Sequence, residues 1–127
     1  MPDAVYEITL PGTPPSFNDV GHTGNRWNWS RAKRLWDGYF TVALLEAKVP
    51  KGKLSFVSAS ATLFFTTNRK RDVGNYRTIL EKCCGDALQL GWLDDDDPEH
   101  YEFGAVTFEK IAKGKPPKTI VRLEVTK

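Results

Sequence analysis

The chain has 127 residues, of which 40% are hydrophobic and 27% charged, and its formal net charge is +2. This size and composition predict one domain over residues 1–127 with a packed core, and exclude bulk disorder. No apolar run approaches the roughly 20 residues of a membrane-spanning helix, and no secretory signal pattern begins the chain, so we expect a soluble, cytoplasmic protein without a membrane partner.

The first part of the chain predicts a strand, a loop and a helix. Residues 6–10 read as a strand that Pro11 ends, and residues 12–28 are rich in Gly, Pro and Asn, as in a long loop. Ser30 can cap a helix running to about Lys48, which has one broad apolar face.

The middle of the chain predicts a strand followed by a second helix. Apolar side chains occupy alternate positions after Gly52, which is the period of a strand with one buried face. Helical spacing then predicts a helix over residues 74–90, with Gly91 as its C-cap. Cys83 and Cys84 are adjacent within it and are expected to be reduced, buried thiols.

Residues 101–109 and 119–126 read as two further strands with a Gly/Pro turn between them. The element order β-α-β-α-β-β predicts an α+β fold in which two helices pack on a small mixed β-sheet.

The residues that carry chemistry are carboxylates at two structural transitions. Asp72 lies between the long strand and the second helix, and residues 94–97 are four consecutive aspartates after that helix. Carboxylate oxygens are the ligands that Mg²⁺ prefers, although a run of aspartates is more often only a solvated loop. A helix of about 16 residues spans roughly 24 Å, so one metal site needs a folded-back acidic loop or carboxylates from two subunits.

Several other residues are candidates with two interpretations each. Lys82 and Asp86 share a helix face, either as a surface ion pair or with Lys82 stabilising charge near a metal. Trp27 and Trp29 either stack on exposed bases or anchor the loop to the core. Basic clusters surround the acidic run, a distribution that suits phosphate binding beside a metal.

Four segments in order resemble the RusA-like family of Holliday junction resolvases over nearly the whole chain. They are Ile8-Thr9-Leu10-Pro11 with Pro14-Pro15-Ser16-Phe17-Asn18, then Arg69-Lys70-Arg71-Asp72-Val73-Gly74-Asn75, then Lys82-Cys83-Cys84-Gly85-Asp86-Ala87-Leu88, and finally Gly91-Trp92-Leu93-Asp94-Asp95. No single motif is specific, but together they identify the chain as resembling this family.

The resemblance implies a homodimeric endonuclease of bacterial or phage origin that binds four-way DNA junctions and places paired nicks using Mg²⁺ or Mn²⁺. An alternative is a nuclease of the same fold that acts on other branched or flapped DNA. The resemblance also implies that Asp72 is the first metal carboxylate, that Asp95 is the later one, and that Lys82 is the helix lysine near the active site. The implied DNA-contacting residues are Asn18, Arg69, Lys70, Arg71 and Asn75.

The chain departs from the family pattern at one carboxylate, because Gly74 stands where the pattern has a second Asp. We expect Asp96 to join Asp72 and Asp95 at the metal, with Glu81 as the alternative replacement. Asp94 and Asp96 stay open as alternatives for the later carboxylate itself. If no residue replaces the missing ligand, we expect weak metal binding, and the alternative function is a catalytically weak or inactive protein that binds junctions or other branched DNA.

Overall fold

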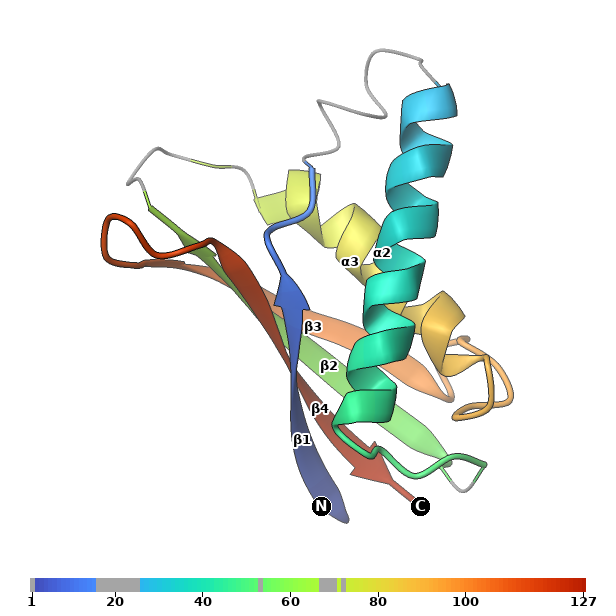
Figure 1. The fold of residues 1–127 in the computed structure, drawn as a ribbon. Coiled ribbons are helices and arrows are strands. Elements are labelled where there is room, and N and C mark those ends of the chain that lie inside the picture. Colours follow the sequence, from blue (N-terminus) through green and yellow to red (C-terminus); the bar gives the residue numbers. More distant parts are fainter. Residues whose placement is uncertain (1, 16–25, 53, 67–70, 72) are drawn as a thin grey trace.

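The fold consists of two helices and four strands. The computed structural model describes residues 2–15, 26–52, 54–66, 71 and 73–127. In chain order its elements are β1 (Ala4–Pro11), α2 (Arg26–Glu46), β2 (Phe56–Phe65), α3 (Val73–Leu88), β3 (Tyr101–Lys110) and β4 (Lys118–Thr126). This order confirms the predicted α+β class with two helices on a small mixed sheet (Figure 1).

The sheet has the strand order β1-β4-β2-β3. Strand β4 pairs antiparallel with both β1 and β2, while β2 pairs parallel with β3. A parallel pair needs a crossover connection, and α3 supplies it. Helix α3 therefore runs between two neighbouring strands, with one chain transition at each of its ends.

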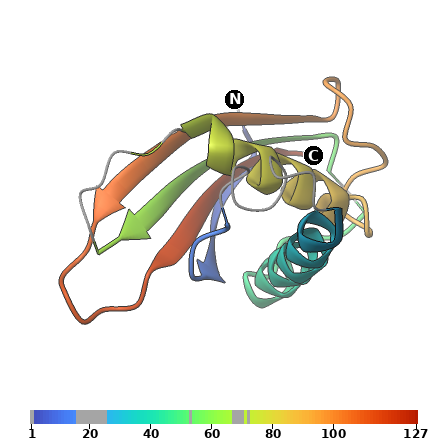
Figure 2. The same cartoon turned by 90° about the horizontal axis from the view of Figure 1, so that it is seen from above.

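The core lies on one face of the sheet, which both helices cover (Figures 1 and 2). The predicted alternation in β2 is confirmed, since the buried side chains are Val57, Ala59, Ala61 and Leu63. The opposite face carries mostly polar side chains, with a few apolar ones such as Val5. There, Ser58 donates a hydrogen bond to Glu102 at 2.9 Å, and the hydroxyls of Thr62 and Thr107 are 3.1 Å apart.

Helix α2 begins at Arg26, four residues before the predicted cap at Ser30. Serine is only mildly unfavourable inside a helix, so it does not force a start there. The predicted apolar face is confirmed, with Trp36 and Phe40 buried at its centre. The helix ends at Glu46, and Lys48, where the prediction placed its end, has a left-handed backbone with φ of 59°.

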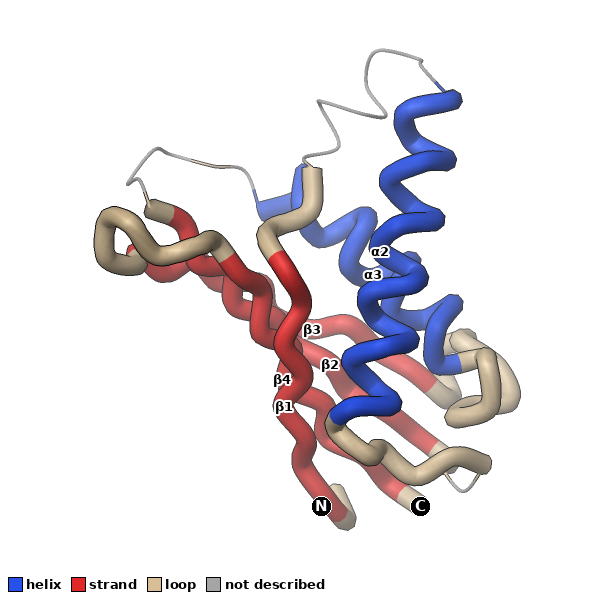
Figure 3. The backbone as a smooth tube through the Cα atoms, in the orientation of Figure 1, coloured by secondary structure: helices blue, strands red, loops and turns tan. Residues whose placement is uncertain are grey.

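Helix α3 ends at Leu88, two residues before the predicted end. The backbone N–H groups of Trp92 and Leu93 both donate to the Leu88 carbonyl, at 2.9 and 2.8 Å. Gly91 in this turn has a positive φ of 125°, which agrees with its predicted role in ending the helix. Figure 3 shows the following loop beside the C-terminal end of α3.

Strand β2 begins at Phe56, because Gly52 belongs to a turn rather than to the strand. Gly52 has a φ of 75° and donates a hydrogen bond to the Gly91 carbonyl. Both cysteines of α3 are buried free thiols, as predicted. Among the described residues, neither helix combines the length and apolar character required to cross a membrane.

Candidate active site on helix α3

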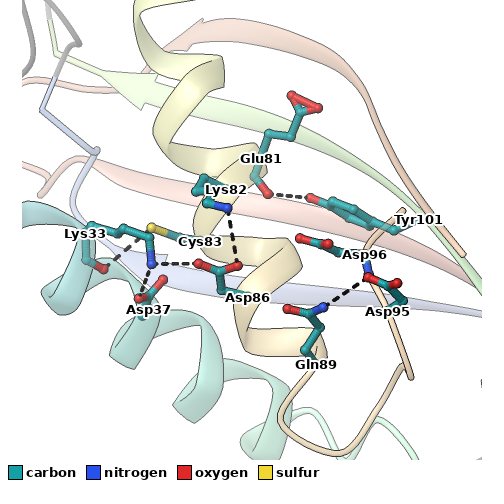
Figure 4. A network of polar contacts seen from close by, with 10 residues as sticks. All are labelled: Lys33, Asp37, Glu81, Lys82, Cys83, Asp86, Gln89, Asp95, Asp96 and Tyr101. Carbon is teal, nitrogen blue, oxygen red and sulfur yellow. Dashed lines mark hydrogen bonds and ion pairs between the residues drawn. The ribbon is translucent and has the colours of Figure 1, made fainter. Parts of the chain in front are cut away.

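The acidic loop of residues 94–97 lies along the C-terminal part of α3 (Figure 4). Asp95 Oδ1 accepts a hydrogen bond from the Gln89 side chain at 3.3 Å, and another from the backbone N–H of Asp96 at 2.7 Å. The first bond ties the loop to the residue that directly follows α3. Asp95 is exposed and Asp96 is half-buried, so two adjacent carboxylates stand at this end of α3.

Gly85 permits the close approach of this loop to the helix. A Cβ atom at Gly85 would lie 3.0 Å from Asp96 Oδ2 and 3.0 Å from the Tyr101 ring. The ring itself is held, because the Tyr101 hydroxyl donates to the Glu81 carbonyl at 2.8 Å. A side chain at position 85 would therefore press on Asp96 and Tyr101, and the absence of one gives the acidic loop room to lie close to α3.

Lys82 and Asp86 share the outer surface of α3, as predicted, but Asp86 has a stronger partner on α2. Lys82 Nζ lies 3.8 Å from Asp86, whereas Lys33 Nζ lies 2.6 Å from Asp86 and 2.8 Å from Asp37. Burial acts to lower the pKa of Lys33, but its hydrogen bonds to Asp37 and Asp86 outweigh burial and raise it. Lys33 therefore stays charged and joins the two helices.

The side chain of Lys82 is the more available of the two lysines. It is 56% exposed, against 25% for Lys33. A shallow groove between the helices is lined by Trp29, Lys33, Thr78, Glu81 and Lys82. Trp29 lies on α2 and packs against the core, which agrees with the anchoring interpretation for this residue, while the side chain of Trp27 lies outside the described part of the chain. Both lysines line this groove, but Lys33 is already paired with Asp37 and Asp86, so Lys82 is the lysine of the groove that is open to a ligand.

Asp97, the last acid of the run, is engaged by His100. Its Oδ1 lies 2.6 Å from His100 Nδ1. This hydrogen bond lowers the pKa of Asp97 and raises the pKa of His100. Asp97 also accepts from the backbone N–H of Glu99 at 3.0 Å. These contacts give Asp97 a local structural role and leave the residues before it as the ligand candidates.

The predicted metal set of Asp72, Asp95 and Asp96 is only partly described. Asp72 lies outside the described residues, and within the described part of the chain no three acidic, His or Cys side chains form a metal-binding group. Helix α3 starts at Val73, and Asp96 approaches it at Gly85, 12 residues later and about 18 Å along the helix axis. Asp95 and Asp96 supply hard oxygen donors that fit Mg²⁺.

Glu81, the alternative replacement for the missing ligand, lies away from the acidic loop. Its carboxylate is 3.9 Å from Arg77 Nε, and Figure 4 shows it directed away from Asp95 and Asp96. Within one chain, this favours Asp96 over Glu81 as the partner of Asp95.

The predicted DNA-contacting residues fall mostly outside the described part, which holds neither Asn18, Arg69 nor Lys70. Arg71 is described, and its guanidinium carbon lies 3.7 Å from the centre of the Phe65 ring. Asn75 is half-buried near the start of α3.

Sequence reasoning missed two features of this site. One is the ion pair between Lys33 and Asp86, which joins α2 to α3. The sequence indicates only that Lys33 and Asp37, four residues apart, share one side of α2. The other is the role of Gly85, which lies within a segment already singled out for its resemblance. No protein-family model and no curated protein sequence matches the chain.

Proposed function

We propose that the chain is a Mg²⁺- or Mn²⁺-dependent endonuclease that resolves four-way DNA junctions by paired phosphodiester hydrolysis, acting as a homodimer. The observation that carries this proposal is the surface of α3. Lys82 lies on α3 two helical turns before Gln89, the residue that directly follows the helix and whose side chain donates a hydrogen bond to Asp95. This order of lysine and aspartates is the one that the family resemblance implies.

The metal would be held by Asp95 and Asp96 together with Asp72. A divalent ion beside a phosphodiester lowers the pKa of a bound water and neutralises developing negative charge. Because α3 separates its own two ends by about 18 Å or more, a shared ion requires a shifted acidic loop or carboxylates from two copies of the chain.

The residues around the metal would orient the DNA backbone. Lys82 is exposed, and its ammonium group lies 3.8 Å from Asp86. Because this ion pair is long and open to solvent, the ammonium group would be able to turn from Asp86 to a phosphate oxygen. Lys33 neutralises Asp86 at 2.6 Å and so reduces the competition for Lys82. Lys33 acts through Asp86 and is therefore a positioning residue.

A second candidate function is junction binding without cleavage. It is favoured by Gly74, which provides no carboxylate in the first turn of α3 where the family pattern has one. The two functions share the DNA substrate and differ only in the metal-dependent step.

The experiment uses the purified chain with a synthetic four-way junction and a duplex of matched length. Binding is measured in chelator, and cleavage is measured after adding Mg²⁺ or Mn²⁺. Preferential junction binding with metal-dependent paired nicks supports the nuclease. Junction binding without nicks supports the second candidate, and equal or absent binding to both DNAs contradicts both.

A further inference from the structure

Helix α2 carries a second apolar surface, on the side that faces away from the core. Leu35, Val42 and Leu45 are 53%, 54% and 52% exposed, and they are half of the exposed large hydrophobic side chains among the described residues. Their spacings of seven and three residues place them on one side of the helix. Figure 2 views α2 nearly along its axis and shows one side turned away from the sheet and from α3.

Gly38 lies within this apolar surface, in the interior of the helix. No atom of the described residues outside its own helical surroundings comes within 4 Å of a Cβ atom placed on it. Glycine weakens a helix interior relative to alanine. Nothing in the described fold of one chain therefore accounts for a glycine here, whereas a close-packed partner would.

The surface is hollowed at Gly38 and charged at its two ends. The groove is lined by Arg31, Ala32, Arg34, Leu35, Gly38, Tyr39 and Val42. Arg31 and Arg34 are exposed toward the N-terminal end of the surface, and Glu46 is exposed at its C-terminal end. This surface thus has a hollow at Gly38, an exposed apolar side chain next to it at Val42, and charges of opposite sign at its two ends.

We infer that this surface of α2, defined by Leu35, Gly38, Val42 and Leu45, is the interface with a second copy of the chain, the two helices running antiparallel about a two-fold axis. Positions 35, 38, 42 and 45 have the three- and four-residue spacing of a coiled-coil seam. In an antiparallel pair centred near residue 40, Val42 of each copy faces Gly38 of the other. Leu35 then faces Leu45.

The charges decide the direction of the pair and favour a second copy as the occupant. Antiparallel helices in this register bring Arg34 of one copy opposite Glu46 of the other, twice by symmetry. Parallel helices would place the basic ends together. The surface is complementary to itself in both shape and charge, which a site for an unrelated apolar segment does not require.

The first test measures the mass of the full-length chain by light scattering and its dissociation constant by sedimentation, without DNA or metal. The wild type should have twice the 14.3 kDa chain mass at micromolar concentration. Leu35→Glu/Val42→Glu should raise the dissociation constant by about 100-fold or more. Leu90→Glu is the matched control, because Leu90 is 62% exposed but lies off this surface, and it should leave the dimer intact.

The second test addresses the antiparallel register. Arg34→Glu and Glu46→Arg should each weaken the dimer, and an equimolar mixture of the two variants should form a heterodimer in which both charge pairs are restored. A monomeric wild type overturns the inference, as does a dimer that Leu35→Glu/Val42→Glu leaves unchanged or a mixture that does not recover. Because no readout involves cleavage, these outcomes are separate from those that test the nuclease.

Discussion

Replacing Gly85 by alanine tests whether the acidic loop rests directly on α3. In an open helix interior this change stabilises a protein by about 1 kcal/mol, because alanine has the higher helix propensity. Here the new methyl group would lie 3.0 Å from both Asp96 Oδ2 and the Tyr101 ring. Overpacking of this kind costs about 1–3 kcal/mol.

The balance is unfavourable because Tyr101 cannot easily move. Its side chain is buried, its hydroxyl is bonded to the Glu81 carbonyl, and its backbone N–H donates to the Asp97 carbonyl at 2.9 Å. We expect Gly85→Ala to destabilise the fold by about 1 kcal/mol, which lowers the melting temperature by about 4 °C in a chain of this size. Urea denaturation and thermal melts measure both values.

A double-mutant cycle locates the clash. Asp96→Ala removes one of the two close atoms, so Gly85→Ala should cost about 0.5–1 kcal/mol less in that background. Gly38→Ala, in the Leu35→Glu/Val42→Glu background, reports the propensity gain alone. If Gly85→Ala raises the melting temperature as much as Gly38→Ala does, the acidic loop does not pack on α3 as described.

Three further predictions concern charges and thiols. Lys33→Met should lower the free energy of unfolding, measured by urea denaturation, by about 1–2 kcal/mol, because it leaves partly buried carboxylates without their cation. Lys82→Met should change it by no more than about 0.5 kcal/mol. Equal effects of the two substitutions would contradict the inter-helix bridge. The hydrogen bond to Asp97 raises the pKa of His100 above 6.5. The stability that this pair contributes is therefore fully present below pH 6.5 and is lost as the pH rises through the raised pKa. An NMR titration of His100 should show the higher pKa, and Asp97→Asn should return that pKa toward 6.5. Burial raises the pKa of Cys84 to about 12, so a disulfide reagent at pH 8 should modify it only after unfolding, and rapid labelling of the native chain would contradict its burial.

The amphipathic elements could be predicted from the sequence because their patterns are local. The alternation in β2 and the helical spacing in α3 each specify one buried face, and the structure confirms both. Element ends were less predictable. Ser30 has the chemistry of a cap, but the residues before it continue the helix, and Trp29 packs against the core.

The contacts between elements could not be predicted, since they depend on how the helices pack. Lys33 and Asp86 are far apart in sequence and meet only because α2 crosses α3. The approach of Asp96 to Gly85 likewise depends on where the chain enters β3. The sequence shows that carboxylates lie at both ends of α3. Which side chains of α3 these carboxylates contact depends on the fold.

The most direct measurement of the proposed activity is the rate of four-way junction cleavage in Mg²⁺ by Asp72→Asn and Asp95→Asn. Both substitutions are nearly isosteric and remove a negative charge that would hold the metal. Glu99→Gln is the matched control, because Glu99 is an exposed acid in the same segment with no assigned metal role. We predict that both aspartate variants bind the junction but no longer cut it, while the wild type and Glu99→Gln cut at similar rates. Cleavage by both aspartate variants at the wild-type rate would contradict the assignment of the site.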